Sequence, residues 1–360
     1  MQANRDNFFS IAKGIAIILM VIGHSGCPDV LSNFIYMFHM PLFFIISGML
    51  FKESYLVDKV SRVTFLKKRI KGLYFPYVKY GLLFLLFHNM FYYLNIYNNV
   101  YGFRGQVSHI YGVHDYIHGV LNVITMTGAE QLLGGYWFLE FLFLGGVIFF
   151  ILRHYLKSSV IFFLCAFGGV LIYCFKDRMI LGNFGSFLVC SLVFISLGNY
   201  TKDFFMKAKS MKRIVILPLF FIILLASLVF PSAIGRVDWL FFIPFVVIAV
   251  LGTFMTLTIS SSFDKSKNSL CIFLKYAGDN SLTILTWHFL TFKIVSYIII
   301  VLYDLPIEEL AYFPRIEKYS IMGWWVVYSI AGVTIPLLLK RVVDVSSLMR
   351  NVKKQGSNNV

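Results

Sequence analysis

The chain has 360 residues, of which 59% are hydrophobic, 18% aromatic and only 14% charged. A soluble domain carries roughly 25% charged and 45–50% apolar residues, so this composition excludes an ordinary water-soluble domain. The net charge of +15 does not indicate nucleic-acid binding, because the basic residues stand in short runs between apolar segments, as the positive-inside rule of membrane proteins produces.

Long apolar segments follow one another along the whole chain, and each is of the length that crosses a bilayer as a helix. The first contains Lys13 and His24 and lacks a small-residue cleavage site, so we expect a retained span rather than a signal peptide. A shorter segment, 116–128, is expected in the interface or as a re-entrant turn. We predict an all-α polytopic membrane bundle of about ten transmembrane helices, at 8–27, 33–51, 73–94, 136–152, 159–175, 183–199, 214–231, 239–260, 279–302 and 320–340.

The basic residues predict the orientation. With the N-terminus inside, the inner segments hold 23 lysines and arginines and the outer segments hold six. Since cytoplasmic loops accumulate Lys and Arg, we expect both termini to face the cytoplasm. No internal repeat is evident, and we expect one membrane domain, 1–345, followed by a short polar cytoplasmic tail, 346–360. The five cysteines show no paired spacing and indicate neither disulfides nor a zinc site.

Two ionisable residues lie in the first expected helix, where burial of charge in lipid is costly. Eleven residues separate Lys13 from His24, so both lie on one helix face, about 16 Å apart along the axis. This arrangement suits a protein that binds an anion at the inner end and does proton chemistry deeper. The alternative is a lysine that extends its amine to the headgroups and a histidine that caps the helix.

The second expected helix contains His39, two residues before Pro41. Proline frees a backbone carbonyl and can kink a membrane helix. If this helix returns from the outer face, His39 lies at a depth similar to that of His24, and the two form an acid/base or substrate-orienting pair. The alternative is a histidine bonded to a neighbouring helix.

Together these motifs resemble the membrane acyltransferase-3 family, and the second motif resembles its fucose 4-O-acetylase-like branch. The resemblance implies a multi-pass enzyme of the bacterial inner membrane that O-acetylates sugars of surface polysaccharides. It implies that His24 is catalytic and that Lys13 is the basic residue paired with it. The chain departs from the family pattern at Ser10 and Gly72, where an acidic and a basic residue are usual. The motif residues are Arg5, Lys13-Gly14, Gly23-His24, Phe38-His39-Met40-Pro41-Leu42-Phe43-Phe44 and Ser47-Gly48.

The resemblance also implies an acyl donor, acetyl-CoA. We expect no metal, because no ligand set is evident in the sequence. Coenzyme A carries several phosphate charges, which suits the seven basic residues at 52–72, and we name Lys68, Arg69 and Lys71 as donor-binding candidates. The same charges also follow from topology alone. His24 can act as a general base on a sugar hydroxyl or as a nucleophile that carries the acyl group.

Other polar positions are weaker candidates. Glu140 can orient a histidine or a hydroxyl or lie at the interface, and His288 and Lys293 can line the cavity or serve packing. A metal site at His114 and His118 lacks further ligands. The expected partners are acyl-CoA, a sugar or polysaccharide acceptor and membrane lipids. A secondary transporter or flippase stays as the rival function, as does transfer to a non-sugar acceptor. The oligomeric state is not indicated.

Overall fold

The computed structural model describes residues 7–103, 105–179, 182–266 and 268–357, with the side chains of 345 and 347–357 left aside. Within these ranges the chain is helical, and only two isolated β-bridges occur. The α-helices are α1 (Asn7–His24), α2 (Asp29–Tyr36), α3 (His39–Met49), α4 (Lys59–Arg69), α5 (Phe75–Leu86), α6 (His88–Tyr93), α7 (Val113–Thr125), α8 (Trp137–Leu152), α9 (Ser158–Phe175), α10 (Gly182–Tyr200), α11 (Lys202–Met206), α12 (Ile216–Val229), α13 (Phe242–Ser266), α14 (Ser269–Asp279), α15 (Ser281–Tyr303), α16 (Glu317–Tyr319) and α17 (Trp325–Ser357).

Seven stretches in the described part are long and apolar enough to cross a membrane, and a bent pair of helices at 202–229 raises this number to eight. The prediction of an all-helical, multi-pass membrane protein is therefore confirmed. The number of ten stays a prediction, for two reasons. The expected span 73–94 is divided into α5 and α6, and α8 has only 16 residues. The seven stretches are 7–24, 29–49, 158–178, 182–200, 239–266, 281–303 and 317–344.

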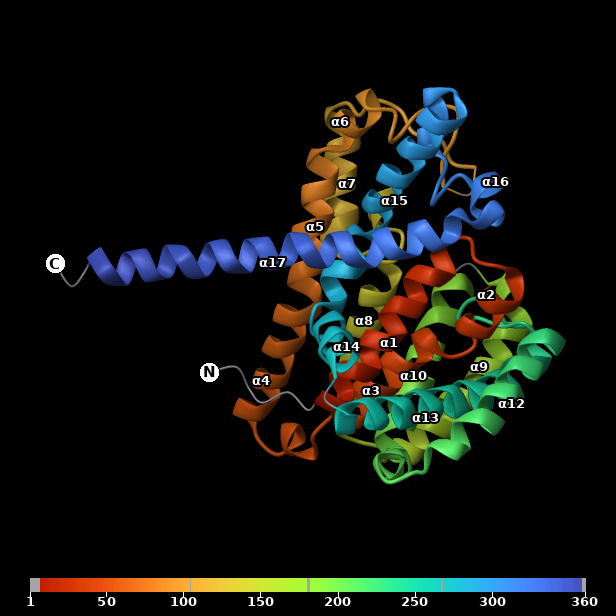
Figure 1. Cartoon of the computed structure of the whole chain (residues 1–360). Coiled ribbons are helices and arrows are strands. Elements are labelled where there is room, and N and C mark those ends of the chain that lie inside the picture. The colour runs from red at the N-terminus through yellow and green to blue at the C-terminus, as the bar shows by residue number, and fades with distance from the viewer. Residues whose placement is uncertain (1–6, 104, 180–181, 267, 358–360) are drawn as a thin grey trace.

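Helix α1 lies at the centre of the bundle and packs against α3, α13, α14 and α17 (Figure 1). It is apolar over most of its circumference, as a helix surrounded by other helices must be. Its contact with α14 is the closest, because a Cβ at Gly14 would come within 2.0 Å of the Leu274 carbonyl oxygen and one at Gly278 within 1.7 Å of the Ser10 oxygen. Small residues of this kind allow helix backbones in membranes to approach closely.

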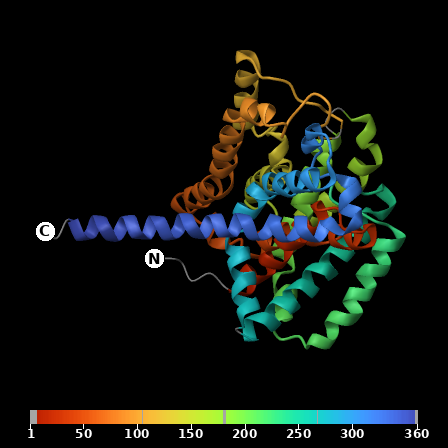
Figure 2. The ribbon, with the colours of Figure 1, turned by 45° about the horizontal axis from the view of Figure 1, so that its top comes forward.

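Helices α5 to α7 form an arm beside the central helices (Figure 1). The connecting segments of this arm lie at the same end of the molecule as α16 and the C-terminal part of α15. Helix α17 continues far beyond the other helices, as Figure 2 shows from a second direction. It runs without a break through the expected boundary at residue 345, so a division into a domain and a tail is not marked by a helix end.

Pro41 lies in the first turn of α3, where a missing N–H costs no helical hydrogen bond. The chain breaks before it, at Met37 and Phe38, between α2 and α3. The proline therefore starts a helix rather than kinking one, and the expected second span consists of two short helices. This break places the end of α2 beside His39 at the start of α3.

Candidate active site

His24 is the last residue of α1, and Tyr36 at the end of α2 lies beside it. The Tyr36 hydroxyl is 3.4 Å from His24 Nδ1 and donates to the Gly23 carbonyl at 3.3 Å. A Cβ at Gly23 would lie 3.4 Å from the Tyr36 ring, so the glycine leaves room for this contact. His24 is half-buried, and its ring also packs edge-on against Phe289 with centroids 5.1 Å apart.

His39 is buried, and its ring lies 5.1 Å from the Tyr36 ring, so Tyr36 contacts both motif histidines. His39 Nδ1 is 2.8 Å from the carbonyl oxygen of Ile35. Because a carbonyl only accepts, we assign the proton to Nδ1, which leaves Nε2 with its basic lone pair. The expected proximity of His24 and His39 is thus present, with a tyrosine between them.

His288 completes the group from α15. Its ring lies 5.7 Å from that of His24, and it is fully buried. Nδ1 faces the carbonyls of Ile284 and Leu285 at 3.0 and 2.9 Å, so the proton belongs there and Nε2 carries the lone pair. Nε2 is buried without a hydrogen-bond partner in the described part of the chain. We call His24, Tyr36, His39 and His288 the histidine cluster.

Two arginines bring positive charge to the histidine cluster. Arg315 donates from Nη1 to the His24 carbonyl at 2.9 Å, and the Arg236 guanidinium lies 5.8 Å from the Tyr36 ring. Gly26 has a φ of +84°, and a Cβ there would lie 2.1 Å from Arg315 Nε, so this glycine permits both the turn and the arginine. Arg315 Nη2 also lies 3.7 Å from the exposed Glu317 carboxylate, which offsets part of this charge. The remaining positive charge favours an oxyanion formed beside His24.

Lys293 is buried in α15 and donates to the carbonyls of Leu310 and Tyr312 at 2.9 and 2.6 Å. These contacts fix the segment that leads to Arg315. Its place is therefore structural support behind the histidine cluster. Two residues of the expected helix 279–302 were weak candidates from the sequence. His288 belongs to the histidine cluster, and Lys293 does not.

Lys13 lies at the opposite end of α1 from His24, half-buried, three helical turns away. In the same turn Ser10 donates to Asp279 Oδ1 at 2.7 Å, and Lys275 pairs with the other oxygen of Asp279 at 2.9 Å. A carboxylate is thus present beside Ser10, contributed by α14. Lys13 is too far along α1 to share a reacting atom with His24.

The structure separates the three donor-binding candidates. Arg69 turns inward and donates to Ser47 Oγ at 2.8 Å, and its guanidinium packs against the backbone of Gly146. Burial lowers the pKa of Arg69 to about 10, and no described carboxylate pairs with it. Lys68 is exposed and donates to the Tyr55 hydroxyl at 3.2 Å, while Lys71 points to the surface. A π-helical turn follows Arg69, a feature common at functional sites.

The cluster and Arg69 lie at opposite ends of α3. Ser47, which accepts the hydrogen bond from Arg69, follows His39 by eight residues, or about 12 Å of helix.

Glu140 on α8 is half-buried and makes no hydrogen bond or ion pair within the described residues. His109 pairs with Asp115 at 3.5 Å, and no described group of three potential ligands could hold a metal ion.

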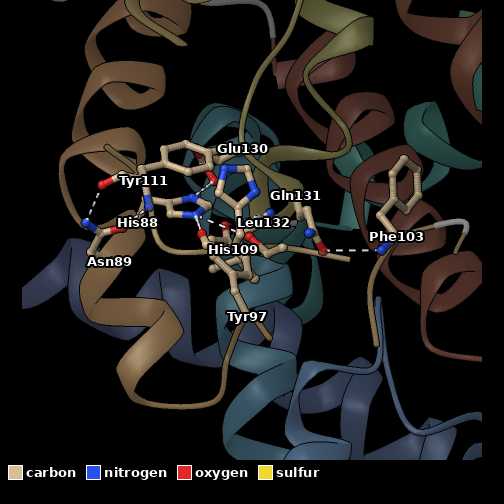
Figure 3. A network of polar contacts seen from close by, with 10 residues as sticks. His88, Asn89, Tyr97, Phe103, His109, Tyr111, Glu130, Gln131 and Leu132 are labelled. Atoms are coloured by element: carbon tan, nitrogen blue, oxygen red, sulfur yellow. Dashed lines mark hydrogen bonds and ion pairs between the residues drawn. The ribbon is translucent and has the colours of Figure 1, made fainter. Parts of the chain in front are cut away.

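Tyr36, Arg236 and Arg315 were not predicted as site residues. A buried ion pair between His88 and Glu130 (Figure 3), 2.9 Å apart, was not predicted either, because its two segments meet only in the fold. An ionisable residue within the expected span 73–94 was the available signal for His88.

A family model described as an acyltransferase domain matches residues 6–341, which is nearly the whole chain. The match confirms the resemblance at the level of the family, and the fucose 4-O-acetylase-like branch stays a prediction. Comparisons with curated proteins and with solved structures gave no significant match.

Proposed function

The chain belongs to this acyltransferase family, and from that premise we propose that it moves an acetyl group from acetyl-CoA to a hydroxyl of a surface-polysaccharide sugar. The observation that carries the proposal is the histidine cluster, where the His24 ring lies beside that of His288, and Tyr36 links His24 to His39, with two arginines next to the group. Ionisable side chains gathered inside a membrane protein mark a functional site.

Arg69 is the residue we assign to the donor. It is a cation turned into the bundle without a carboxylate, and its planar guanidinium suits a phosphate or pyrophosphate group. Lys68 and Lys71, on the same segment, add charge at lower affinity, because both are exposed and screened by solvent. Lys13 adds a further positive charge on α1. The thioester then reaches the histidine cluster along α3.

His24 takes the proton of the acceptor hydroxyl as the hydroxyl oxygen bonds to the thioester carbonyl carbon. Arg315 and Arg236 stabilise the negative charge on the carbonyl oxygen. When the carbon–sulfur bond breaks, the proton passes to the departing thiolate and His24 is neutral again. A second route, in which His24 first accepts the acyl group and then passes it to the sugar, uses the same residues.

The surroundings of the proposed reaction follow the charge distribution. We propose that both termini and the donor lie on the cytoplasmic side of the bacterial inner membrane, where the basic segments gather. The acceptor is then met at the other side, where polysaccharide repeat units are exposed after export.

The test uses washed membranes that contain the full chain and polysaccharide from the source organism. Label from acetyl-CoA is followed into an alkali-labile ester, with His24→Ala compared at equal expression. The exposed His114→Ala serves as the matched control. We expect label in wild type and control and a loss of at least a hundredfold in His24→Ala. Equal label in all three would remove His24 from the reaction, and no label in any would favour a transporter.

A further inference from the structure

A second polar site lies in the arm formed by α5 to α7 and the segment that leads to α8. It is a cavity of about 310 Å³. Its lining combines hydroxyl, amide, imidazole and carboxylate groups with aromatic rings, chiefly His88, Ser108, Tyr111, Asn122, Glu130 and Gln131. None of these residues belongs to the histidine cluster.

The wall of the cavity is a rigid network (Figure 3). His88 and Glu130 form a buried ion pair, and the Tyr111 ring stacks on His88 with centroids 3.3 Å apart. Asn89 fixes Tyr111 by two hydrogen bonds to its backbone, at 2.8 and 3.0 Å. A buried network whose members are satisfied holds its shape, which a binding site requires.

Ser108, His88 and Glu130 stand in the order of a hydrolytic triad, with Ser108 Oγ 3.2 Å from His88 Nε2. The carbonyl of His109 lies 3.0 Å from the same nitrogen. Because the carbonyl only accepts, Nε2 carries a proton and cannot take one from Ser108. The network therefore builds a binding wall rather than a nucleophile.

The charge of the lining selects the ligand. No lysine or arginine occurs among the described lining residues, and the Glu130 charge is paired with His88. A carboxylate in the wall, that of Glu130, favours a neutral ligand over a phosphate-bearing one such as coenzyme A. Free hydrogen-bonding groups remain, because the side-chain amide of Gln106 and the amide NH₂ of Gln131 have no partner in the described part of the chain. A neutral polyhydroxylated ligand matches these groups.

The volume of the cavity agrees with a neutral polyhydroxylated ligand. About 310 Å³ is near the lower end of the roughly 300–1,000 Å³ found for small-molecule sites. It accommodates one sugar unit with its neighbours outside the opening. Two aromatic residues, Tyr111 and Phe103, line the cavity beside the polar groups, and aromatic rings pack well against the C–H groups of a sugar.

Aromatic contacts connect the cavity with the histidine cluster. Phe103 packs on Phe313 at 5.0 Å, Phe313 on Phe289 at 4.7 Å, and Phe289 on the His24 ring at 5.1 Å. The segment with Glu130 and Gln131 continues to Gly135, where a Cβ would lie 4.0 Å from His288 Cε1. The cavity is therefore joined to the histidine cluster through three successive aromatic contacts and through the segment 130–135.

We propose that this cavity binds a neutral sugar unit of the acceptor glycan and presents a neighbouring hydroxyl to the histidine cluster. The inference rests on the proposed function and adds the place and the chemical class of the acceptor. Ala129 lines the cavity and is exposed, so we choose Ala129→Trp to narrow the cavity. Ile117 on α7 is 57% exposed and outside the lining, and Ile117→Trp is the matched control.

The experiment measures saturation transfer by NMR from the purified full chain to methyl glycosides of a neutral hexose, a deoxyhexose and an N-acetylhexosamine, with methyl glucuronide as the anionic comparison. We expect transfer to at least one neutral glycoside, retained in Ile117→Trp and lost in Ala129→Trp. In the acyl-transfer assay Ala129→Trp should raise the acceptor KM at least tenfold and leave the acetyl-CoA KM unchanged.

No transfer to any neutral glycoside, transfer unaffected by Ala129→Trp, or competition by acetyl-CoA would overturn the proposal. The NMR experiment measures binding without turnover. The carbohydrate site and the acyl-transfer function can therefore be refuted independently of each other. Glycoside binding at the cavity without acyl transfer would refute the proposed function and keep the carbohydrate site. Acyl transfer with an unchanged acceptor KM in Ala129→Trp would refute the site and keep the function.

Discussion

His39 and His288 share one arrangement: each gives its Nδ1 proton to a backbone carbonyl one turn earlier, at distances of 2.8 to 3.0 Å. A helix carbonyl thereby selects the tautomer, and Nε2 becomes the basic atom without the help of a carboxylate. In His288 this atom is buried and has no partner among the described residues, which costs free energy unless a substrate uses it.

His288→Asn tests this assignment, because the asparagine amide replaces the Nδ1 donor and removes Nε2. We expect kcat to fall about 10²- to 10⁴-fold, the usual contribution of a proton-transfer group, with the melting temperature close to that of the wild type. Steady-state kinetics beside thermal unfolding would measure both. Wild-type kcat in His288→Asn would mean that the residue serves packing alone.

Arg69→Ala should raise the acetyl-CoA KM at least tenfold, since a charge-assisted hydrogen bond to phosphate contributes about 1.5–3 kcal/mol. Lys68→Ala should change it less than about twofold, because an exposed ion pair contributes little. Donor KM at two salt concentrations would separate the two variants. Equal effects of both substitutions would contradict a specific donor role for Arg69.

His24, His39 and Lys13 were singled out by their positions in apolar segments, and the family resemblance implied catalytic roles for His24 and Lys13. The structure brings the two histidines together through Tyr36. His288 was only a weak candidate from the sequence. Its contact with His24 depends on how α15 packs against α1, and the two residues are 264 positions apart in the chain. Arg315 and the His88–Glu130 pair depend likewise on long-range packing, which no local pattern encodes.

At the scale of elements, glycines decide how closely the helices approach. Gly278 of α14 lies against the Ser10 carbonyl of α1, next to the Ser10–Asp279 hydrogen bond. This contact holds α1, with His24 at its end, against the rest of the bundle.

Gly278→Ala should destabilise the protein by about 1–3 kcal/mol, the usual cost of overpacking, because its Cβ would lie 1.7 Å from a backbone oxygen. Gly168→Ala on α9 is the control: no atom lies within 4 Å of the added Cβ, and alanine favours a helix. Thermal unfolding in detergent compares them. An undiminished melting temperature in Gly278→Ala would show that α1 and α14 separate without cost.

Most helices coincide with segments expected from hydropathy, because a 17–22-residue apolar run in lipid has no alternative to a helix. The breaks were not predicted. The stop at Met37 and Phe38 precedes the proline, and the stop between α5 and α6 precedes His88, whose side chain pairs with Glu130. The second of these breaks is stabilised by a partner distant in sequence.

At the scale of the whole molecule, basic residues gather at the segments that we place in the cytoplasm. Single cysteines in a cysteine-free background should then react differently with a membrane-impermeant maleimide in intact cells. Val107→Cys, exposed in the arm, should be labelled from outside, and Ser210→Cys, exposed near α11, only after permeabilisation. Labelling of Ser210→Cys in intact cells would reverse the orientation.

The histidine cluster as the place of acyl transfer is tested most directly by glycan-dependent release of free coenzyme A from acetyl-CoA, measured with the purified chain in proteoliposomes. The expected result is glycan-stimulated release in wild type and in His114→Ala and no stimulation above background in His24→Ala. Stimulation in His24→Ala equal to that of the wild type would place the chemistry elsewhere in the molecule.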